Sequence, residues 1–349
     1  MRPFVSIGLI VIVGLLAAVL TGFRTDLLFG SRGYDEEQEG LKQRIVIKFS
    51  HVVAENTPKG LAAERFAKLV REKTNGRVEV QVFPNGILYS DTTEIPALLD
   101  GEIQMIAPAF SMLSNVIPAW SVMDLPYAFR DQQDVEKAFQ GEIGKKLFQT
   151  LESRNMKGLA FWRNGFKQMT SRKPIRTLDD FAGQRFRIMQ SKVLETQFRT
   201  LHATPVSMPF NEVFPNLEKG LADGGENTIS NIYSKRLYQV QKYMTISNHG
   251  YLGYAVIMNE SFWNKLPPDI QAKIMEAMEE TTAWNYQTAL AMNDSQLKLL
   301  KERTDLQIHV LTPEEKAQWQ QALQPVYAAH AEAIGKELMT SLEQLRKQR

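Results

Sequence analysis

Alternating and helically spaced apolar positions follow one another in the first third of the chain. Residues 44–50 and 78–82 alternate and are rich in Ile and Val, a pattern typical of strands. Residues 92–99 predict a helix and residues 103–107 a buried strand. Residues 58–74 predict a further helix, whose apolar side chains share one face: Leu61, Ala62, Phe66, Leu69 and Val70. This β-α-β-α-β order predicts a parallel sheet.

The middle of the chain predicts an excursion into a second lobe. An amphipathic helix over residues 134–151 and a strand over residues 156–162 come first. The second lobe is then predicted from five elements, at residues 166–171, 184–190, 192–201, 204–208 and 211–219. Asn211 is expected to cap the last of these, a helix that Gly220 ends. Residues 251–258 predict a strand that returns to the first lobe, so two crossings would form a hinge.

The last quarter of the chain is predicted to be mostly helical. Residues 268–303 contain little Gly or Pro and keep a helical pattern, which predicts a helix about 50 Å long at 1.5 Å per residue. Such a helix is long enough to lie across both lobes. Residues 305–311 predict one more strand, and residues 313–345 predict helices that close the chain.

Composition indicates a globular protein with enough apolar material for two packed cores. The chain has 349 residues, of which 44% are hydrophobic and 23% charged. Its formal net charge of +2, with acidic and basic residues evenly mixed, argues against a nucleic-acid partner. There are no cysteines, which excludes disulfides, a thiol nucleophile and a lipoprotein anchor.

The N-terminus predicts export. Residues 4–23 form an apolar run without charge, followed by Arg24. Residues 1–23 are therefore either a signal peptide or an N-terminal membrane anchor, and both alternatives stay open because the run is long and lacks a clean cleavage pattern. Residues 24–43 contain Gly, Ser and a run of acidic residues with little periodicity, which predicts a flexible linker.

Signals for catalysis are weak throughout the sequence. It contains no phosphate-binding glycine loop, no His-Glu-x-x-His and no Gly-x-Ser-x-Gly. The five histidines are too dispersed for local metal-ligand spacing. No cofactor, no metal site and no enzymatic activity are therefore predicted.

Two arginines in one predicted strand indicate an anion site. Arg185 and Arg187 are two residues apart, so both point to one side of the strand while Phe186 and Ile188 point to the other. A guanidinium at a strand end can hold a carboxylate through two parallel hydrogen bonds. For an isolated arginine, however, a simple surface cation is the more common situation.

Many short segments, in one order and spacing, resemble the solute-binding proteins of TRAP transporters, most closely the C4-dicarboxylate-binding branch of the DctP type. The resemblance covers nearly all of the chain beyond the N-terminus. It implies an α/β, two-lobed periplasmic binding protein fold with hinge crossings and a long helix spanning both lobes. The matching segments are residues 45–52 (IVIKFSHV), 74–78 (TNGRV), 124–127 (DLPY), 164–171 (NGFKQMTS), 185–193 (RFRIMQSKV), 223–231 (DGGENTISN), 249–254 (HGYLGY) and 311–313 (LTP).

The resemblance implies roles for individual residues. Arg187 takes the position of an arginine that forms a two-pronged salt bridge with a substrate carboxylate, and Asn227 that of an asparagine whose amide bonds the same carboxylate. A second carboxylate would need further donors, for which Lys167 and His51 are available. Without the family, Asn227 would equally fit a turn and His51 a surface or capping position.

Three further residues complete the candidate substrate site. Gln190 and Ser191 follow Arg187 at the strand end and could donate hydrogen bonds. Phe210 matches an aromatic residue that packs on the carbon chain of the ligand, although core packing or a helix staple would explain it equally well. A site with this much positive charge favours a diacid, because a neutral ligand would leave buried donors unpaired.

The resemblance implies an extracytoplasmic receptor that closes on malate, succinate or fumarate and delivers it to the small and large membrane subunits of a TRAP transporter. Residues 44–165 would form the first part of lobe I, residues 166–250 lobe II, and residues 251–349 the return to lobe I with the long helix. The expected location is periplasmic, with membrane contact if the N-terminal segment is uncleaved. The alternatives are a binding module of this fold for another organic acid or for a sensor system, and a periplasmic enzyme.

Overall fold

A continuous mixed sheet organises the part of the chain that the computed structural model describes, residues 12–13 and 44–347. The strand order is β2-β1-β3-β8-β4-β7-β5-β6, and β9 pairs with β8. The strands are β1 (Ile45–Ser50), β2 (Val78–Phe83), β3 (Met105–Ile106), β4 (Met156–Ser171), β5 (Arg185–Ile188), β6 (Thr204–Ser207), β7 (Gly224–Thr228), β8 (Tyr243–Asn259) and β9 (Gln307–Val310). The mixed α/β class predicted from the sequence is confirmed.

The predicted signal peptide or anchor and the predicted linker lie outside the described residues, apart from Ile12 and Val13. Within residues 12–13 and 44–347, no helix combines the length and the apolar character needed to cross a bilayer.

The first half of the sheet follows the predicted β-α-β-α-β order. β1 and β3 are parallel, with Phe49 opposite Met105. Helix α3 (Pro58–Lys73) connects β1 to β2, and α4 (Glu94–Leu99) connects β2 to β3. Thr57 caps α3 by accepting a hydrogen bond from the backbone of Gly60.

Helices that follow β3 cover this half of the sheet, and one prediction for them is wrong. The single helix expected over residues 134–151 is two helices, because Gly141 has an extended backbone (φ −97°, ψ −159°). A Cβ at Gly141 would lie 2.4 Å from the carbonyl oxygen of Lys137, so only glycine fits this break. The elements are α5 (Phe110–Ser114), the 3-10 helix η2 (Pro118–Asp124), α6 (Gln132–Gln140) and α7 (Glu142–Glu152).

The second half of the sheet is built around β5, which pairs in parallel with both β6 and β7. The predicted helix over residues 211–219 is a 3-10 turn followed by a shorter helix, and Asn211 does not cap it. The remaining elements here are η3 (Leu178–Phe181), α8 (Lys192–Thr200), η4 (Phe210–Glu212), α9 (Val213–Glu218), α10 (Ile229–Ser234) and η5 (Leu237–Gln239).

Two long antiparallel strands join the two halves. β4 has 16 residues and β8 has 17, and their pairing extends from Met156 opposite Asn259 to Ser171 opposite Tyr243. The sequence predicted separate strands before and after Asn164-Gly165, which was wrong. Register shifts between Gly158 and Ala160, between Arg163 and Gly165, and between Lys167 and Met169 absorb the polar interruption without ending the strand.

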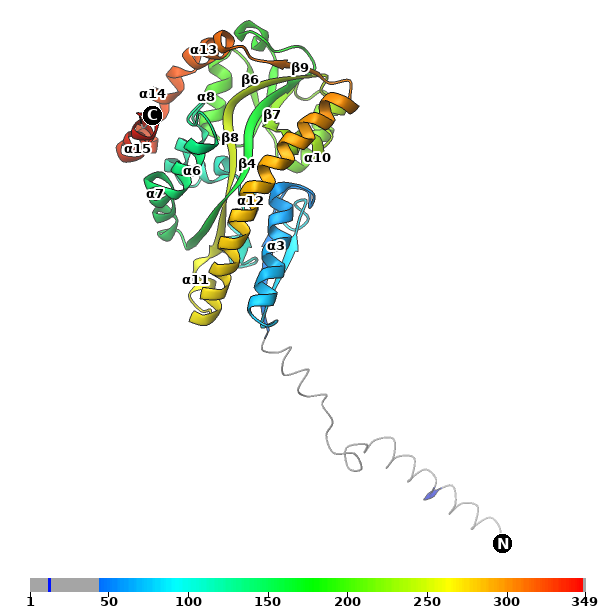
Figure 1. The fold of residues 1–349 in the computed structure, drawn as a ribbon, viewed down its shortest axis with the longest axis vertical. Coiled ribbons are helices and arrows are strands. Elements are labelled where there is room, and N and C mark those ends of the chain that lie inside the picture. The colour runs from blue at the N-terminus through cyan, green and yellow to red at the C-terminus, as the bar shows by residue number, and fades with distance from the viewer. Residues whose placement is uncertain (1–11, 14–43, 348–349) are drawn as a thin grey trace, which may run out of the picture. The chain divides into compact units, whose positions relative to one another are not determined.

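A helix of 36 residues, α12 (Pro268–Arg303), confirms the predicted long helix and lies along both halves of the sheet. It follows the short helix α11 (Glu260–Trp263) and packs against α3 at one end and α10 at the other (Figure 1). Asn285 accepts a hydrogen bond from the Arg163 backbone (2.7 Å), and Asn293 donates one to the carbonyl of Asn164 (2.7 Å). The helix is therefore attached to β4 where the strand crosses between the halves.

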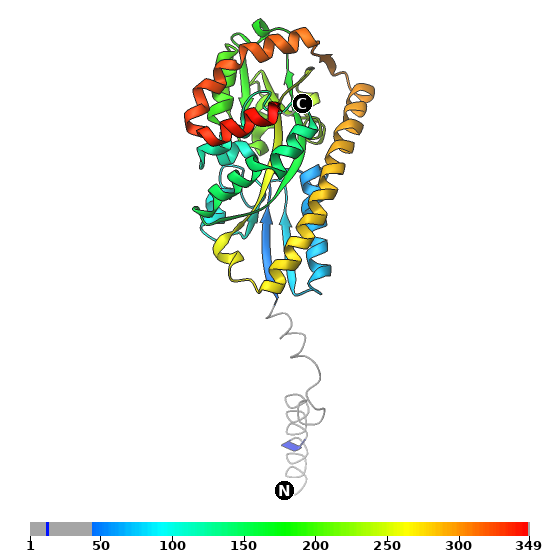
Figure 2. The ribbon, with the colours of Figure 1, turned by 60° about the vertical axis from the view of Figure 1, so that its left-hand side comes forward.

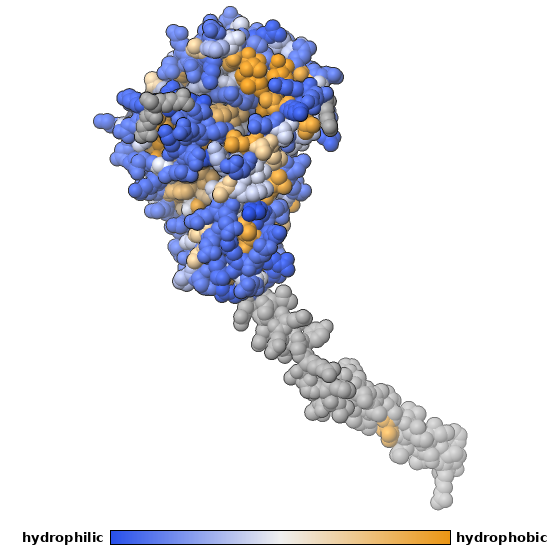
Figure 3. All heavy atoms as spheres, viewed as in Figure 1, coloured by the Kyte–Doolittle hydropathy of each residue, from blue (hydrophilic) through white to orange (hydrophobic). Residues whose placement is uncertain are grey.

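Three helices follow β9: α13 (Pro313–Ala322), α14 (Gln324–Ile334) and α15 (Lys336–Lys347). They run along the side of the sheet away from α12, where α14 meets η2 and α8, and α15 meets α6 and α7 (Figure 2). One apolar core includes both Ile106 of the first half and Phe186 of the second. The visible outer face is largely hydrophilic, with smaller apolar areas between the polar residues (Figure 3).

Candidate functional site

A small cavity lies where residues from both halves of the sheet meet. Its polar wall comes from distant parts of the chain: Lys59, Asp91, Asn227, Asn231 and Tyr254. Phe210, Met112, Met189 and Leu252 contribute apolar surface. In open α/β sheets, the loops at the carboxyl ends of strands form the usual ligand crevice, and the loop after β1 contributes Val52 and Val53 here.

Arg187, the third residue of β5, is held in a buried and oriented position. Its side chain is fully enclosed, and Nε and Nη2 both donate to the carbonyl oxygen of Met208 (3.2 and 2.8 Å). Burial lowers the pKa of Arg187, whereas Asp91 and Glu226 oppose that shift. Arginine nevertheless stays protonated in proteins, so the site holds a fixed positive charge.

Arg185 differs from Arg187 although both belong to one strand. It is exposed, and its guanidinium forms an ion pair with Asp223 (2.9 Å). Arg185 is therefore paired at the surface, whereas Arg187 is enclosed.

Asn227 and Phe210 both line the cavity. Asn227 Oδ1 accepts hydrogen bonds from the Thr228 backbone (3.0 Å) and from Asn231 Nδ2 (2.8 Å), which fixes the orientation of its amide. The backbone N–H of Phe210 donates to Asp91 Oδ2 (3.1 Å). Because Asp91 precedes α4 and Phe210 follows β6, this bond joins the two halves of the sheet.

Lys167 lies on β4 and is neutralised inside the protein. Its Nζ is 2.7 Å from Glu226 Oε1, and Glu226 Oε2 is 2.7 Å from His249 Nε2. Nδ1 of His249 is 2.7 Å from the hydroxyl of Ser247. We call these four residues the Glu226 cluster. Burial would raise the pKa of Glu226, but Lys167 and His249 lower it to about 2.

His51 follows β1 and is buried beside the cavity wall. Among the described residues, neither ring nitrogen has a hydrogen-bond partner. Burial and the nearby charge of Lys59 lower the pKa of His51 to about 3, so its ring is neutral at physiological pH. The residue therefore offers a hydrogen-bonding group rather than a cation.

Ser191 and Gln190 lie at a contact between the two halves and are not among the residues that line the cavity. The hydroxyl of Ser191 caps α8 and donates to Asp124 Oδ2 (2.7 Å), and Asp124 Oδ1 accepts from Ser111 (2.6 Å). The side chain of Gln190 is exposed, while its carbonyl accepts a hydrogen bond from Asn115.

Three charged residues of the site were not identified from the sequence: Lys59, Asp91 and Glu94. Lys59 and Glu94 are fully buried, and Asp91 nearly so. Lys59 attracts both acids electrostatically and lowers the pKa of His51, so we call these four residues the Lys59 cluster. The sequence does contain a pattern that indicates the burial of Lys59. This residue shares a helix face with Ala63, Phe66 and Val70, at spacings of four, seven and eleven residues.

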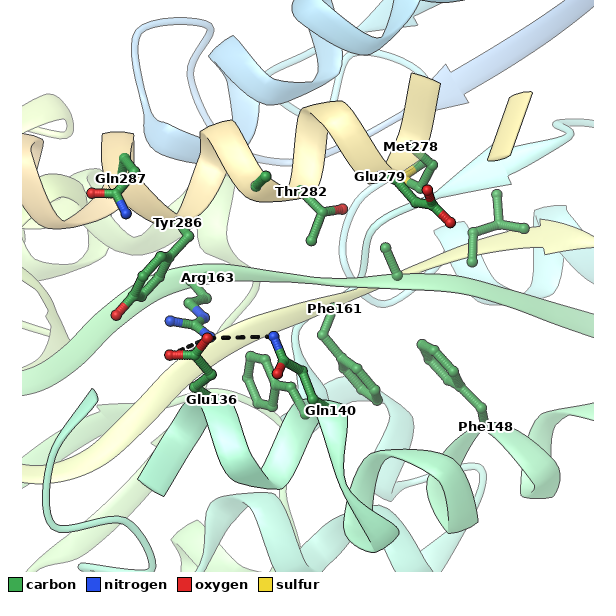
Figure 4. A pocket seen from close by; sticks show the side chains of 14 residues that line it. Glu136, Gln140, Phe148, Phe161, Arg163, Met278, Glu279, Thr282, Tyr286 and Gln287 are labelled. Atoms are coloured by element: carbon green, nitrogen blue, oxygen red, sulfur yellow. Dashed lines mark hydrogen bonds and ion pairs between the residues drawn. The ribbon is translucent and has the colours of Figure 1, made fainter. Parts of the chain in front are cut away.

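A second, larger cavity lies between α12, β4 and the helices α6 and α7 (Figure 4). Its wall includes four aromatic residues: Phe139, Phe148, Phe161 and Tyr286. Phe148 stacks on Phe161 with ring centroids 4.2 Å apart, and the Arg163 guanidinium lies 3.6 Å from the Tyr286 ring. No candidate substrate-binding residue lines it. The smaller cavity is the candidate ligand site, because several buried polar and charged groups converge there.

Two halves of one sheet, joined by crossing strands and enclosing a charged cavity, define a two-lobed solute-binding protein. The chain belongs to the bacterial extracellular solute-binding proteins, family 7, whose model matches residues 49–333. This confirms the family recognised from the sequence motifs, which is a family of binding proteins.

Relatives and solved structures agree with this assignment. The C4-dicarboxylate-binding protein DctB of Bacillus subtilis is 49% identical over 99% of both chains. The C4-dicarboxylate-binding periplasmic protein DctP of Rhodobacter capsulatus is 44% identical over 87% of this chain and 91% of that protein. A TRAP periplasmic solute-binding protein of Sulfurospirillum deleyianum with bound succinate is 43% identical, with a TM-score of 0.83, covering 86% of this chain and 99% of that one.

Proposed function

We propose that this protein is the extracytoplasmic receptor of a TRAP transporter and captures a C4-dicarboxylate such as succinate, malate or fumarate. The observation that supports this most directly is the buried, oriented guanidinium of Arg187. Arg187 is not among the residues that line the cavity, but it attracts Asp91, which lines the cavity together with Asn227. The names and bound ligands of the relatives support the same substrate class.

Arg187 and Asn227 bind the first carboxylate in this proposal. The carbonyl of Met208 occupies the edge of the guanidinium formed by Nε and Nη2. It leaves the Nη1 edge for the ligand, and two N–H groups on that edge suit the two oxygens of a carboxylate. The amide of Asn227, fixed by Asn231, supplies a further donor.

Binding is coupled to closure of the two lobes. Lobe I comprises residues 44–165 and 251–349, and lobe II comprises residues 166–250, so β4 and β8 form the hinge. The ligand stabilises the closed arrangement because it contacts groups from both lobes. Direct bonds such as Asp91 to Phe210 and Ser191 to Asp124 add to that stabilisation.

The closed receptor then delivers its ligand to the small and large membrane subunits of the transporter. The N-terminal segment directs export to the periplasm and, if retained, anchors the receptor to the inner membrane. The periplasmic relative of Rhodobacter capsulatus supports this location.

The test is calorimetric titration and thermal unfolding with succinate, malate, fumarate, butyrate and a sugar acid. Wild type should bind the C4 diacids, and a ligand at a hundredfold excess over its Kd should stabilise it by about 2.7 kcal/mol. Arg187→Ala should weaken diacid binding by at least about 100-fold, because it removes a charge-assisted, bidentate contact.

Arg185→Ala is the matched control, since it removes an exposed arginine from the same strand. It should leave diacid affinity unchanged. If only sugar acids or monoacids bind to wild type, the substrate assignment is wrong. If both arginine variants bind diacids like wild type, the role assigned to Arg187 is wrong.

A further inference from the structure

A dicarboxylate needs a second positive group, and the two side chains first considered for it do not supply one. The ammonium of Lys167 is 2.7 Å from Glu226 in a fully buried pair, so its charge is already compensated. His51 is neutral, because burial and Lys59 lower its pKa to about 3. A closed site that held only Arg187 would leave the second carboxylate without a cation.

Lys59 lies on the wall of the same cavity as Asn227 and is buried without a close counter-ion. Its ammonium donates to the carbonyl oxygen of Ala107 (2.8 Å) and lies 3.9 Å from the centre of the Tyr254 ring. An ammonium has three N–H donors, so one carbonyl and one aromatic face leave part of its capacity unused. Within residues 44–347, no carboxylate approaches it to ion-pairing distance.

Burial lowers the pKa of Lys59 to about 8, so its ammonium stays mostly protonated at neutral pH. The two nearby acids do not neutralise it. Glu94 is fully buried, and neither of its oxygens has a hydrogen-bond partner among the described residues. Burial raises the pKa of Glu94 to about 8, so this carboxyl is mostly uncharged at neutral pH. Oδ2 of Asp91 accepts from the Phe210 backbone, and Asp91 also attracts Arg187. With Glu94 uncharged, Lys59 and Arg187 together carry one positive charge more than Asp91 offsets, and this excess is available to an incoming dianion.

We propose that the ammonium of Lys59 binds the carboxylate of the ligand that Arg187 does not hold, and that it thereby selects diacids over monoacids. This assignment rests on the proposed function. The two cations come from different lobes, since α3 belongs to the first half of the sheet and β5 to the second. A diacid would then connect the lobes through its own two ends, whereas a monoacid of equal length could not.

The test pairs a change in the protein with a matching change in the ligand. Butyrate has the four-carbon chain of succinate with one carboxylate replaced by a methyl group. Lys59→Met should weaken succinate binding by about 30-fold or more, the loss expected for a charge-assisted hydrogen bond. The same variant should leave butyrate affinity unchanged or improved, because butyrate leaves the ammonium of the wild type unpaired.

Lys68→Met is the matched control, because Lys68 lies on the same helix but is exposed, with its ammonium 3.9 Å from Glu72. It should bind both acids like wild type. Lys59→Gln, which retains an amide donor for the carbonyl of Ala107, gives a second variant if Lys59→Met does not fold.

The outcomes separate the two hypotheses. If wild type binds no C4 diacid, the proposed function and this inference both fail. If wild type binds succinate but the Lys59 variants bind it equally well, only the inference is wrong. Equal losses for succinate and butyrate would also overturn the inference, because they indicate a structural role for Lys59.

Discussion

Two groups of buried ionisable side chains lie in this protein, and they differ in how completely they satisfy one another. In the Glu226 cluster, each carboxylate oxygen of Glu226 has a partner at 2.7 Å, one from Lys167 and one from His249. In the Lys59 cluster, both oxygens of Glu94, both ring nitrogens of His51 and Oδ1 of Asp91 lack partners among the described residues. The polar groups of the Glu226 cluster therefore satisfy one another within the protein, whereas the Lys59 cluster keeps polar groups that could still bind a partner.

The energetic reason for this difference is the cost of removing charge from water. A buried charge is tolerated when a partner compensates it and becomes costly when it is left alone. Buried polar atoms without partners are rare in native proteins, so those of the Lys59 cluster, two members of which line the cavity, call for a partner that the cluster itself does not supply. In our proposal, the ligand supplies a partner for Lys59.

The largest expected effect on stability comes from removing the carboxylate that pairs with Lys167. Glu226→Leu leaves a fully buried ammonium without its counter-ion, which should lower the free energy of unfolding by about 3–5 kcal/mol. Glu94→Leu is the matched control, since it also removes a fully buried carboxyl, but one without partners. This variant should not lower the free energy of unfolding. Urea unfolding without ligand measures both, and equal losses would contradict the distinction between the clusters.

The pH dependence of the free energy of unfolding gives a second test of the difference between the Glu226 cluster and the Lys59 cluster. The pKa of Glu94 is raised from 4.5 to about 8, so the folded state binds more protons than the unfolded state between these values. Stability contributed by Glu94 is therefore complete below pH 4.5 and is lost as the pH rises to 8. Glu94→Gln should consequently be more stable than wild type at pH 8, by roughly 1–3 kcal/mol, and similar to it at pH 4.5.

Thermal or urea unfolding of both proteins between pH 4.5 and 8 provides this measurement. The pKa of His51 is lowered, so its own contribution rises with pH below 6.5 and partly opposes that of Glu94. The difference between variant and wild type removes this common contribution. A difference that does not change with pH would mean that Glu94 is ionised in the folded protein.

The helices and strands were predicted well wherever the helical or alternating spacing of apolar residues continued without interruption. The apolar face of α3, the alternation of β2 and the long run of α12 all formed elements close to the predicted bounds. The failures occurred where one residue changed the outcome. Gly141 divided a predicted helix, and the polar pair Asn164-Gly165 stayed inside β4 because α12 and neighbouring side chains satisfy its polar groups.

The site was harder to predict because its residues meet only in three dimensions. Arg187 and Asn227 could be selected by their motifs, and the structure brings Asn227 to the cavity. The partner of Lys167 could not be selected, because Glu226 lies 59 residues further along the chain on another strand. Similarly, nothing local distinguishes Lys59, whose ammonium meets Ala107 and Tyr254, from the exposed Lys68 on the same helix, except the face on which it lies.

The smallest expected effect concerns the larger, aromatic cavity. Glu136 is 4.0 Å from Arg163, and its side chain is 40% exposed, so Glu136→Gln should change the free energy of unfolding by less than about 1 kcal/mol. Titration of this variant with succinate should give the affinity of wild type, because Glu136 is remote from the residues that form the charged cavity. A clear loss of succinate affinity would mean that the larger cavity takes part in binding. If Glu136→Gln binds succinate like wild type and Arg187→Ala does not, the two results together would support the smaller, charged cavity as the ligand site. Converging buried charges would then identify the site better than the size of the cavity.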